Sequence, residues 1–275
     1  MTPAVLDITI LGSGTSTGIP VVGCDCPVCR SEDPRNQRTR CSALLSCGGR
    51  NVLIDTSTDL RQQALRENIR SIDAVLYTHN HADHVHGIDD LRGFNLRSHK
   101  AIPIYGEAQT LQRISRLFSY IFDDGTPRGF TPQLEPCAVR GPFELFGLSF
   151  VPVPLLHGEL EVFGYRCGPF AYLTDCSSIP DSSLPLLRNL QLLVIDGLRF
   201  KPHPTHFNIA QATAMAQRLG AARTLLTHLN HDVDHRRHAR DLPSGIEFAY
   251  DGQRVTLPIE LNPTAETQTV FRSGR

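Results

Sequence analysis

The segment THNHADH, residues 78–84, decides how the rest of this sequence is interpreted. It overlaps the apolar run AVLYTH at residues 74–79, which predicts a strand followed by a loop at the edge of a sheet. Four potential metal ligands lie within six residues: His79, His81, Asp83 and His84. The two alternating histidines can bind one ion, while Asp83 and His84, turned by the loop, can face a second. Imidazole and carboxylate together suit zinc, manganese, nickel or iron, and this spacing disfavours the alternative of a solvated histidine-rich turn.

Length and composition limit the class of protein. A chain of 275 residues with 40% apolar residues can bury a substantial core, so we expect one domain at residues 1–262 and a polar tail at residues 263–275. The formal net charge of −1, with no long run of one sign, disfavours a nucleic-acid partner. The N-terminal segment lacks a basic start before a long apolar core, and no stretch has the roughly 20 apolar residues of a membrane span. These features predict a soluble, cytoplasmic protein.

The pattern of apolar residues predicts strands interrupted by helices. Helical spacing occurs at residues 208–220 and around Leu111, Ile114, Leu117 and Ile121. A helix between buried strands implies a mixed α/β layered fold. The predicted strands are residues 6–12, 42–49, 51–57, 74–79, 102–106, 148–155, 163–168, 170–176, 190–197 and 222–229.

The T-H-x-H-x-D-H motif resembles the signature of the metallo-β-lactamase superfamily, and further ligand types occur in the expected order over nearly the whole chain. The resemblance implies an αββα four-layer fold with two facing mixed β-sheets flanked by helices. It also implies that His157 completes the first metal's ligand set and that His228 completes the second. Asp175 would bridge the two ions. A loop histidine and a turn aspartate are the alternatives for His157 and Asp175.

Such a site predicts hydrolysis, because two divalent cations lower the pKa of a shared water and stabilise negative charge on a substrate oxygen. A hydroxide nucleophile is the expected product at neutral pH. We place Asp83 both among the ligands and among the catalytic residues. Asp55, at the end of NVLIDTS, resembles the superfamily's acidic residue near the site and would orient a ligand, although an ordinary strand-end residue fits as well.

Cys24, Cys26 and Cys29 form a second candidate metal site, with the compact spacing C-x-C-x-x-C. A structural zinc needs a fourth ligand for tetrahedral geometry, and free thiols or a redox pair are the alternatives. We expect the scattered cysteines to be small buried residues. They are Cys41, Cys47, Cys137, Cys167 and Cys176.

The order of three motifs, G-x-G-T-S-T-G-I-P, G-C-D-C-x-x-C and R-C-S, resembles the PhnP-like branch of the superfamily. That branch contains the phosphodiesterase of the carbon–phosphorus lyase pathway. There a histidine three residues beyond the last active-site histidine is the fourth ligand of the structural zinc, and His231 holds that position here. The pyrroloquinoline-quinone accessory proteins share the cysteine feature but generally lack the intact histidine motif, so the motif favours catalysis.

His206 decides the predicted substrate class, because it lies 22 positions before His228, where the superfamily's phosphodiesterases carry a histidine. In them this histidine contacts the phosphate and protonates the leaving oxygen. His203 is a nearby competitor, and either could be a surface histidine. We favour His206 because it directly precedes FNIAQA, where the helix is expected to begin. Asp196 would orient His206 or be a plain strand-end residue.

The sequence therefore predicts a metal-dependent phosphodiesterase with two catalytic divalent ions (Zn or Mn, or else Ni or Fe) and one structural Zn. The expected substrate is a small, cyclic phosphodiester, and the resemblance suggests a homodimer. Three alternatives remain: a tRNA 3′-processing endonuclease, a glyoxalase-type thioester hydrolase, and a non-catalytic metal-binding accessory protein. We see no long Gly/Pro/basic insertion that could grip tRNA.

Overall fold

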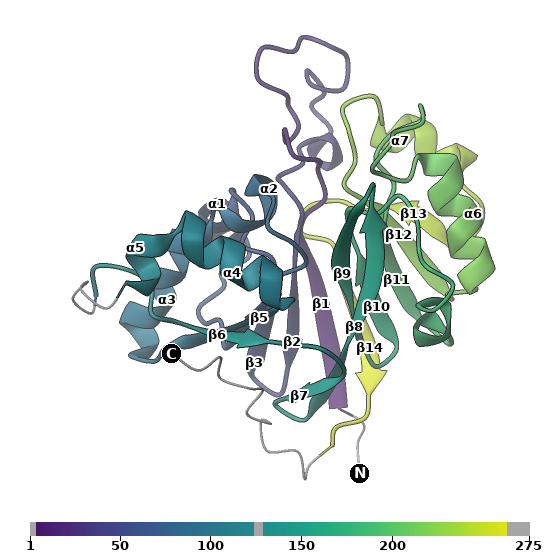
Figure 1. The fold of residues 1–275 in the computed structure, drawn as a ribbon. Helices are drawn as coiled ribbons and strands as arrows, with labels where there is room; N and C mark the ends of the chain where they lie inside the picture. The colour runs from purple at the N-terminus through teal and green to yellow at the C-terminus, as the bar shows by residue number, and fades with distance from the viewer. Residues whose placement is uncertain (1–3, 124–128, 263–275) are drawn as a thin grey trace.

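The computed structural model describes residues 4–123 and 129–262, so the predicted polar tail at residues 263–275 lies outside the described residues. Two seven-stranded sheets face each other, and helices cover the outer face of each (Figure 1). The predicted four-layer α/β architecture is thereby confirmed.

The first sheet has the strand order β14-β1-β2-β3-β4-β5-β6. Its first four strands pair antiparallel, whereas β3, β4, β5 and β6 run parallel to one another. The bounds are β14 (Arg254–Ile259), β1 (Ala4–Gly12), β2 (Ser42–Cys47), β3 (Arg50–Ile54), β4 (Ala74–Leu76), β5 (Ile102–Gly106) and β6 (Leu134–Ala138).

The second sheet repeats this plan in the order β13-β12-β11-β10-β9-β8-β7. Strands β7 to β10 pair antiparallel, and β10 to β13 run parallel. The bounds are β7 (Phe143–Leu145), β8 (Leu148–His157), β9 (Leu160–Cys167), β10 (Phe170–Leu173), β11 (Leu192–Asp196), β12 (Arg223–Thr227) and β13 (Ile246–Phe248).

The helices divide between the two outer faces. Helices α1, α3, α4 and α5 lie on the side of the first sheet, and α6 and α7 lie on the side of the second (Figure 1). The α-helices are α1 (Leu60–Arg66), α2 (Ala82–Val85), α3 (Leu91–Ser98), α4 (Ala108–Leu117), α5 (Ser119–Phe122), α6 (Ile209–Leu219) and α7 (His235–His238). The 3-10 helices are η1 (Pro34–Asn36), η2 (Ile88–Asp90), η3 (Leu184–Leu187) and η4 (Ala239–Asp241).

Three apolar clusters hold the layers together. The largest lies between the sheets and joins side chains such as Ile8 and Leu45 of the first to Phe150 and Tyr165 of the second. A second cluster packs α6 on the second sheet. The third packs α3 and α4 on the first sheet, with Ile114 fully buried in it. The residues of the apolar runs that predicted the strands form the buried faces of the two sheets.

Most predicted elements are confirmed, with differences at their ends. The strands predicted at residues 51–57 and 74–79 end at Ile54 and Leu76, so the polar residues that come next lie in loops. Leu117 belongs to α4 as its spacing predicted, but its side chain is 57% exposed. Four strands were not predicted: β6, β7, β13 and β14 are short or mix polar residues with prolines.

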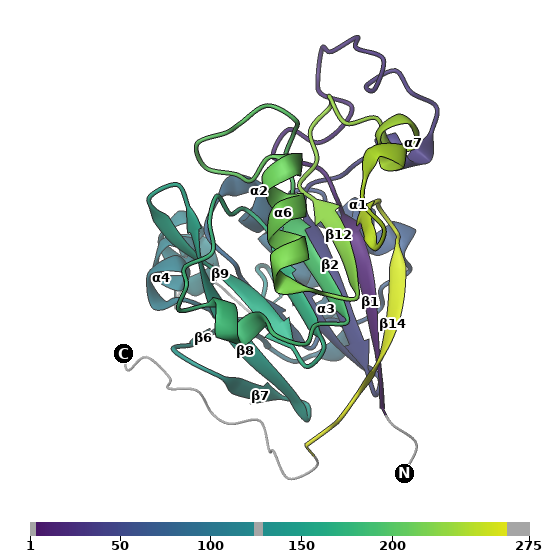
Figure 2. The same cartoon turned by 90° about the vertical axis from the view of Figure 1, so that its right-hand side faces the viewer.

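Strand direction brings distant residues to one end of the molecule. The parallel strands β3 and β4 end at one edge of the first sheet, and β8, β10, β11 and β12 share one direction in the second. Their carboxyl ends meet near α2 and the loop before α6 (Figures 1 and 2).

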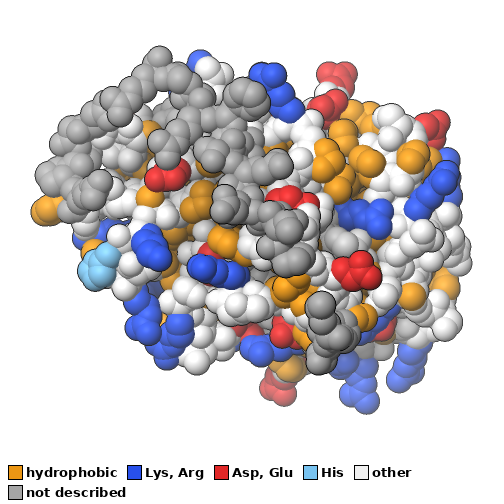
Figure 3. All heavy atoms as spheres, turned by 90° about the horizontal axis from the view of Figure 1, so that it is seen from below, with side chains coloured by type: hydrophobic (Ala, Val, Ile, Leu, Met, Phe, Trp, Pro, Cys, Tyr) orange, Lys and Arg blue, Asp and Glu red, His pale blue; other side chains and the backbone are white. Residues whose placement is uncertain are grey.

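Figure 3 shows the opposite end of the molecule, where basic and acidic side chains are interspersed. Among the described residues, the structure contains no helix with the length and hydropathy that a transmembrane span requires.

Candidate metal centres

The residues predicted to bind two metal ions come together at the meeting point of the strand ends. His157 is the last residue of β8, Asp175 lies two residues after β10, and His228 comes directly after β12. The ligands from residues 79–84 lie in the loop after β4 and in the short helix α2. We call this set the histidine–aspartate cluster; its members are His79, His81, Asp83, His84, His157, Asp175 and His228.

The cluster divides into the two groups that the sequence predicted. Ligand atoms of His79, His81 and His157 lie within 4.8 Å of one another. The same holds for Asp83, His84, Asp175 and His228. His81 is exposed while the other members are buried, so the first group faces solvent, from which a substrate can enter.

Asp175 lies between the two groups. Its Oδ1 is 3.2 Å from His228 Nε2 and 4.0 Å from His79 Nε2, while Oδ2 is 3.2 Å from His84 Nε2. Thr174 Oγ1 donates a hydrogen bond to Oδ2 at 2.6 Å and restrains the carboxylate. The position suits the predicted bridge between two cations, which stays a prediction.

Hydrogen bonds fix which nitrogen of the histidines is free to bind a metal. His84 Nδ1 donates to Asp55 Oδ2 at 2.8 Å, and His157 Nδ1 donates to the Thr205 carbonyl at 2.6 Å. Asp55 also accepts bonds from the amide and hydroxyl of Thr78, both at 2.8 Å. Such partners orient metal-binding imidazoles. Asp55 thus occupies the orienting position that the sequence predicted, whereas Thr78 and Thr205 were not predicted.

The electrostatics of the cluster suit divalent cations. Burial, together with the nearby His84, lowers the pKa of His79 well below its ordinary value, and burial lowers that of His157 to about 4. These rings are therefore neutral, as metal ligands must be. At His84 burial disfavours the charged ring, but the carboxylates of Asp175, Asp83 and Asp55 outweigh it and raise the pKa. The carboxylates thus favour positive charge at the centre of the cluster.

Buried nitrogens without partners support the same assignment. Within the described residues, the Nε2 atoms of three cluster histidines are buried and make no hydrogen bond: His79, His84 and His228. Leaving a buried polar atom unpaired is unfavourable by about 1–3 kcal/mol. Lone pairs that converge beside buried carboxylates are the donor set that zinc, manganese or iron prefers. The residues present therefore fit two divalent metal ions.

Three residues at this end of the sheets have left-handed backbone conformations. The φ angles are 61° at Asp55, 53° at Asp175 and 60° at His228. Residues other than glycine rarely adopt such angles, and each instance is unfavourable by about 1–3 kcal/mol. The conformation turns each chain sharply at its strand end, where Asp175 and His228 lie close to residues of α2 and Asp55 accepts from His84.

His206 and Asp196 form a pair beside the cluster. His206 Nδ1 donates to Asp196 Oδ2 at 2.7 Å, and Asp196 also accepts the amide of Cys176. His206 stacks on His228, with ring centroids 4.7 Å apart. Because Nδ1 is engaged, Nε2 is the nitrogen that can exchange a proton with a ligand. The carboxylate predicted to orient His206 is in place.

His203, the competing histidine, has a different environment. Its Nδ1 accepts the amide N–H of Thr205 at 3.3 Å, and it has no carboxylate partner within the described residues. Its ring centroid lies 5.1 Å from that of His206, further from the cluster. The structure therefore assigns the oriented, buried position to His206.

The predicted ligands of the structural zinc also converge. The sulfurs of Cys24, Cys26 and Cys29 lie 3.2, 3.6 and 3.7 Å from His231 Nδ1. Three sulfurs and one imidazole match a tetrahedral zinc site. We call this set the cysteine cluster. Among the scattered cysteines, Cys41, Cys47, Cys167 and Cys176 are buried as predicted, but Cys137 is only half-buried.

A buried arginine, which the sequence did not reveal, joins the cysteine loop to the segment that carries His231. Arg38 is 1% exposed and donates to the carbonyls of Asn230 and Val233 and to the side chain of Asn36. Asn36 in turn accepts the amide of His235. No local pattern identifies such a residue, because the two carbonyls that it joins to the cysteine loop lie almost 200 positions away in the chain.

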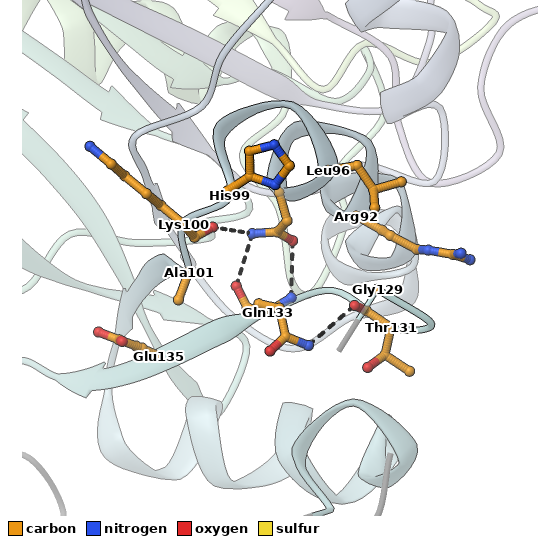
Figure 4. A pocket seen from close by; sticks show the side chains of 10 residues that line it. Arg92, Leu96, His99, Lys100, Ala101, Gly129, Thr131, Gln133 and Glu135 are labelled. Carbon is orange, nitrogen blue, oxygen red and sulfur yellow. Dashed lines mark hydrogen bonds between the residues drawn. The ribbon is translucent and has the colours of Figure 1, made fainter. Parts of the chain in front are cut away.

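A large cavity elsewhere contains no residue of either cluster. It measures about 500 Å³, lies beside α3, and is lined by residues that include Arg92, His99 and Lys100 (Figure 4). The Asn95 amide beneath it donates to the carbonyls of Lys100 and Gln133. Asn95 thus ties α3 to the segment after it at the floor of the cavity, away from both clusters.

The fold and the site together define a metal-dependent hydrolase. The model of the beta-lactamase superfamily domain matches residues 50–229. A crystal structure described as a new diphosphatase from the PhnP family is 45% identical, covers 94% of this chain and 100% of its own, and has a TM-score of 0.88. The chain belongs to the metallo-β-lactamase superfamily and is a PhnP-like member of it.

Two further relatives are similar to this chain and have other names. An octanoyltransferase of Porphyromonas gingivalis is 43% identical over 253 residues, which is 90% of this chain but 51% of that protein. The chain thus spans about half of it. A coenzyme PQQ synthesis protein B of Methylobacterium nodulans is 31% identical over 68% of this chain and 71% of its own length.

Proposed function

We propose that the protein hydrolyses small phosphodiesters at the histidine–aspartate cluster. The observation that carries the proposal is the Asp196–His206 pair, which is buried beside the cluster with His206 Nδ1 bonded at 2.7 Å. Thioester hydrolysis has no need of a second proton donor at this place, because a thiolate leaving group is weakly basic. A phosphodiester with an alkoxide leaving group does need one, because the departing oxygen is strongly basic.

The proposed holders of two divalent ions are the two groups of the cluster, with Asp175 between them. When bound, such ions polarise a phosphoryl oxygen and lower the pKa of water. We propose Zn or Mn as the catalytic metals, with Ni or Fe as alternatives, and a structural Zn at the cysteine cluster. The related PqqB structure from Methylobacterium extorquens is described as Zn²⁺-bound.

The chain's own residues supply binding and proton transfer. His206 Nε2 would give its proton to the leaving oxygen, while Asp196 holds Nδ1 and stabilises the ring when it is charged. Asp83 remains assigned to both the ligand set and the catalytic set. Its Oδ2 lies 3.3 Å from His84 Nε2 and 3.6 Å from His228 Nε2, at the centre of the second group.

Two findings support a small phosphorus ester as the substrate. The relative with 45% identity is named a diphosphatase, so hydrolysis at phosphorus occurs on this scaffold. The net charge of −1 offers little electrostatic attraction for long RNA. Cyclic phosphodiesters are the predicted preference, and a homodimer in the cytoplasm is the predicted state.

The experiment that tests this function compares three substrates with the zinc- or manganese-loaded protein. We expect turnover of bis(p-nitrophenyl) phosphate, none of a glutathione thioester, and none of precursor tRNA at its 3′ end. Preferred hydrolysis of the thioester would make the protein a glyoxalase-type enzyme. Preferred cleavage of tRNA would make it an endonuclease, and no turnover of any substrate would favour an accessory role.

A further inference from the structure

His228 differs from the other buried histidines of the histidine–aspartate cluster, because no hydrogen bond orients its ring. Within the described residues, neither Nδ1 nor Nε2 of His228 makes one. The rings of the other buried histidines in the cluster bond through Nδ1 to a threonine hydroxyl, an aspartate or a backbone carbonyl. The His228 ring stacks on His206. Its place within that stack therefore depends on how the backbone at His228 is held.

The residue directly after His228 is held at both of its backbone groups. The N–H of Leu229 donates to the Ser13 carbonyl at 2.9 Å, and the Leu229 carbonyl accepts the N–H of Thr15 at 3.1 Å. Leu229 is fully buried, so water does not compete for these bonds. The loop at residues 13–15 thus fixes the backbone that carries His228.

This loop belongs to the motif GSGTSTGIP at residues 12–20, to which the proposed function assigns no role. A Cβ added at Gly12 would lie 1.9 Å from the Arg40 carbonyl oxygen, and one added at Gly14 would lie 2.8 Å from that of Arg38. The two glycines therefore let the loop lie directly against residues 38–40. Ser13, between them, is fully buried.

The carboxylate of Asp251 joins this loop to residues 38–40. Its Oδ1 accepts the N–H and the hydroxyl of Ser13 at 2.9 and 2.8 Å. Its Oδ2 accepts the N–H and the hydroxyl of Thr39 at 2.8 and 2.6 Å, and Arg66 Nη1 at 3.1 Å. The side chain is only 6% exposed. Burying a carboxylate is unfavourable unless donors surround it, and these five donors meet that requirement.

Asp251 is itself fixed, because the turn between β13 and β14 is anchored on both sheets. The N–H of Gly252 donates to the Ile10 carbonyl at 2.8 Å, and Ile10 belongs to β1 in the first sheet. The N–H of Ala249 donates to the Leu226 carbonyl at 2.8 Å, and Leu226 belongs to β12 in the second. The carboxylate thus transmits the position of the sheets to the loop.

We propose that Asp251 is a positioning residue of the catalytic centre, which places His228 through Ser13 and the backbone of Leu229. This inference rests on the proposed function, because it needs metal ions at the histidine–aspartate cluster. The partners of the other histidines act on their rings, whereas Asp251 acts on a ligand through the main chain. Loss of its charge should therefore weaken metal binding by the group that contains His228.

The test uses Asp251→Asn in the full chain, which keeps the shape of the side chain but replaces one acceptor oxygen by a donor group. Titration of the metal-free protein with Co²⁺ separates the two clusters, because thiolate ligands give an intense charge-transfer absorption that imidazole and carboxylate ligands lack. We expect the affinity for one ion of the histidine–aspartate cluster to fall by about 10- to 100-fold, as for other groups that orient metal ligands. The thiolate absorption should be unchanged.

Asp73→Asn is the matched control. Asp73 also accepts a backbone N–H, that of Asn51, and an arginine, Arg50. It lies directly before β4, at the opposite end of that strand from the metal ligands. We expect Asp73→Asn to bind Co²⁺ like the parent, and an equal loss of affinity in both variants would overturn the inference.

A second pair of variants tests the route from Asp251 to His228 and does not depend on the folding of Asp251→Asn. Ser13→Ala and Thr39→Val each remove one hydroxyl donor from the carboxylate, but Ser13 alone is bonded to Leu229. We expect Co²⁺ affinity at the histidine–aspartate cluster to be lower in Ser13→Ala than in Thr39→Val. Equal affinities would mean that Asp251 supports only the fold, and would overturn the inference.

The remaining outcomes separate this inference from the proposed function. Parental Co²⁺ affinity in Asp251→Asn, even with a lower Tm, would overturn the positioning role and leave phosphodiester hydrolysis standing. If the parent binds two ions at the cluster but hydrolyses no phosphodiester, the proposed function is wrong, and the titration still decides the role of Asp251. A parent that binds no Co²⁺ at the cluster would contradict both.

Discussion

The histidine–aspartate cluster and the cysteine cluster receive residues from one segment, His228 and His231, yet they are built differently. The first collects its ligands from the ends of several strands in both sheets. The second takes three of its four ligands from residues 24–29, in a loop without regular secondary structure. The packed sheets fix the positions of the ligands in the histidine–aspartate cluster. In the cysteine cluster, the ligands themselves lie in the loop that a bound metal would order.

From this difference we infer a catalytic role for the histidine–aspartate cluster and a structural role for the cysteine cluster. A cluster fixed by two packed sheets keeps its geometry through many turnovers, which catalysis requires. A cluster in a loop gains its order from the metal, so that metal binding contributes to folding. Substitutions in the first should therefore affect turnover, and substitutions in the second should affect stability.

The largest effect is expected for Asp175→Ala. We expect turnover of bis(p-nitrophenyl) phosphate to be abolished, because the carboxylate between the two groups is removed along with its negative charge. Metal analysis should find weaker binding of both catalytic ions. Asp181→Ala, at an exposed residue paired with Arg218, is the control and should behave like the parent. Activity of Asp175→Ala near that of the parent would refute the bridging role.

The next effect concerns His206, which we expect to act as a general acid, a role that contributes about 10²- to 10⁴-fold. His206→Ala should slow hydrolysis of an alkyl phosphodiester far more than that of a p-nitrophenyl ester, because p-nitrophenolate leaves without a proton. Both metals should be retained. An equal loss on both esters would indicate phosphate binding instead, and loss of metal would make His206 a ligand.

A smaller effect is expected for Asp55→Asn, which removes the charge beside His84 Nδ1 but keeps the shape of the side chain. Partners of this kind typically contribute about 10- to 100-fold to metal affinity. Titration of the metal-free protein with Zn²⁺ would measure the change. The control is Asp73→Asn, at a carboxylate that pairs with Arg50 instead. Unchanged affinity in Asp55→Asn would mean that Asp55 only supports the backbone.

The smallest effect on turnover, and the largest on stability, is expected for Cys29→Ser. A metal present at about 1,000 times its Kd stabilises the folded state by about 4 kcal/mol. Since 1 kcal/mol shifts Tm by about 2–4 °C in a chain of 150–250 residues, we expect Tm to fall by about 10 °C and one zinc to be lost. Turnover well below the new Tm should change less than about threefold.

Cys137→Ser is the control for Cys29→Ser, because Cys137 belongs to neither cluster. A full zinc content and an unchanged Tm in Cys29→Ser would show that the cysteine cluster is not a zinc site. A loss of turnover as large as that of Asp175→Ala would remove the contrast between the two clusters.

The clusters of ligands that are close in the sequence, and the buried strands, could be predicted from the sequence. Four ligands in residues 79–84 and three in residues 24–29 are visible as spacing, and buried strands are visible as apolar runs. The four-layer order came from resemblance to a family. The end of β3 was placed too late, because Asp55 turns the chain in a left-handed conformation that no sequence pattern requires.

Contacts made by the backbone could not be predicted. The Thr205 carbonyl orients His157, but any residue could supply that carbonyl. Arg38 reaches the carbonyls of Asn230 and Val233, which only the tertiary fold brings near. The sequence favoured His206 over His203 by its position directly before the helix, but the partners that distinguish them, Asp196 and the Thr205 amide, are visible only in the fold.

The residues with left-handed backbone conformations at the strand ends imply that this fold gives up some stability for activity. Asp55, Asp175 and His228 would each be replaced by glycine at little conformational expense, because glycine adopts positive φ without strain. The chain nevertheless keeps residues whose side chains are needed there. Glycine substitutions should therefore relieve backbone strain in the metal-free fold while they remove its chemistry, so these turns are poor places to engineer a more robust enzyme.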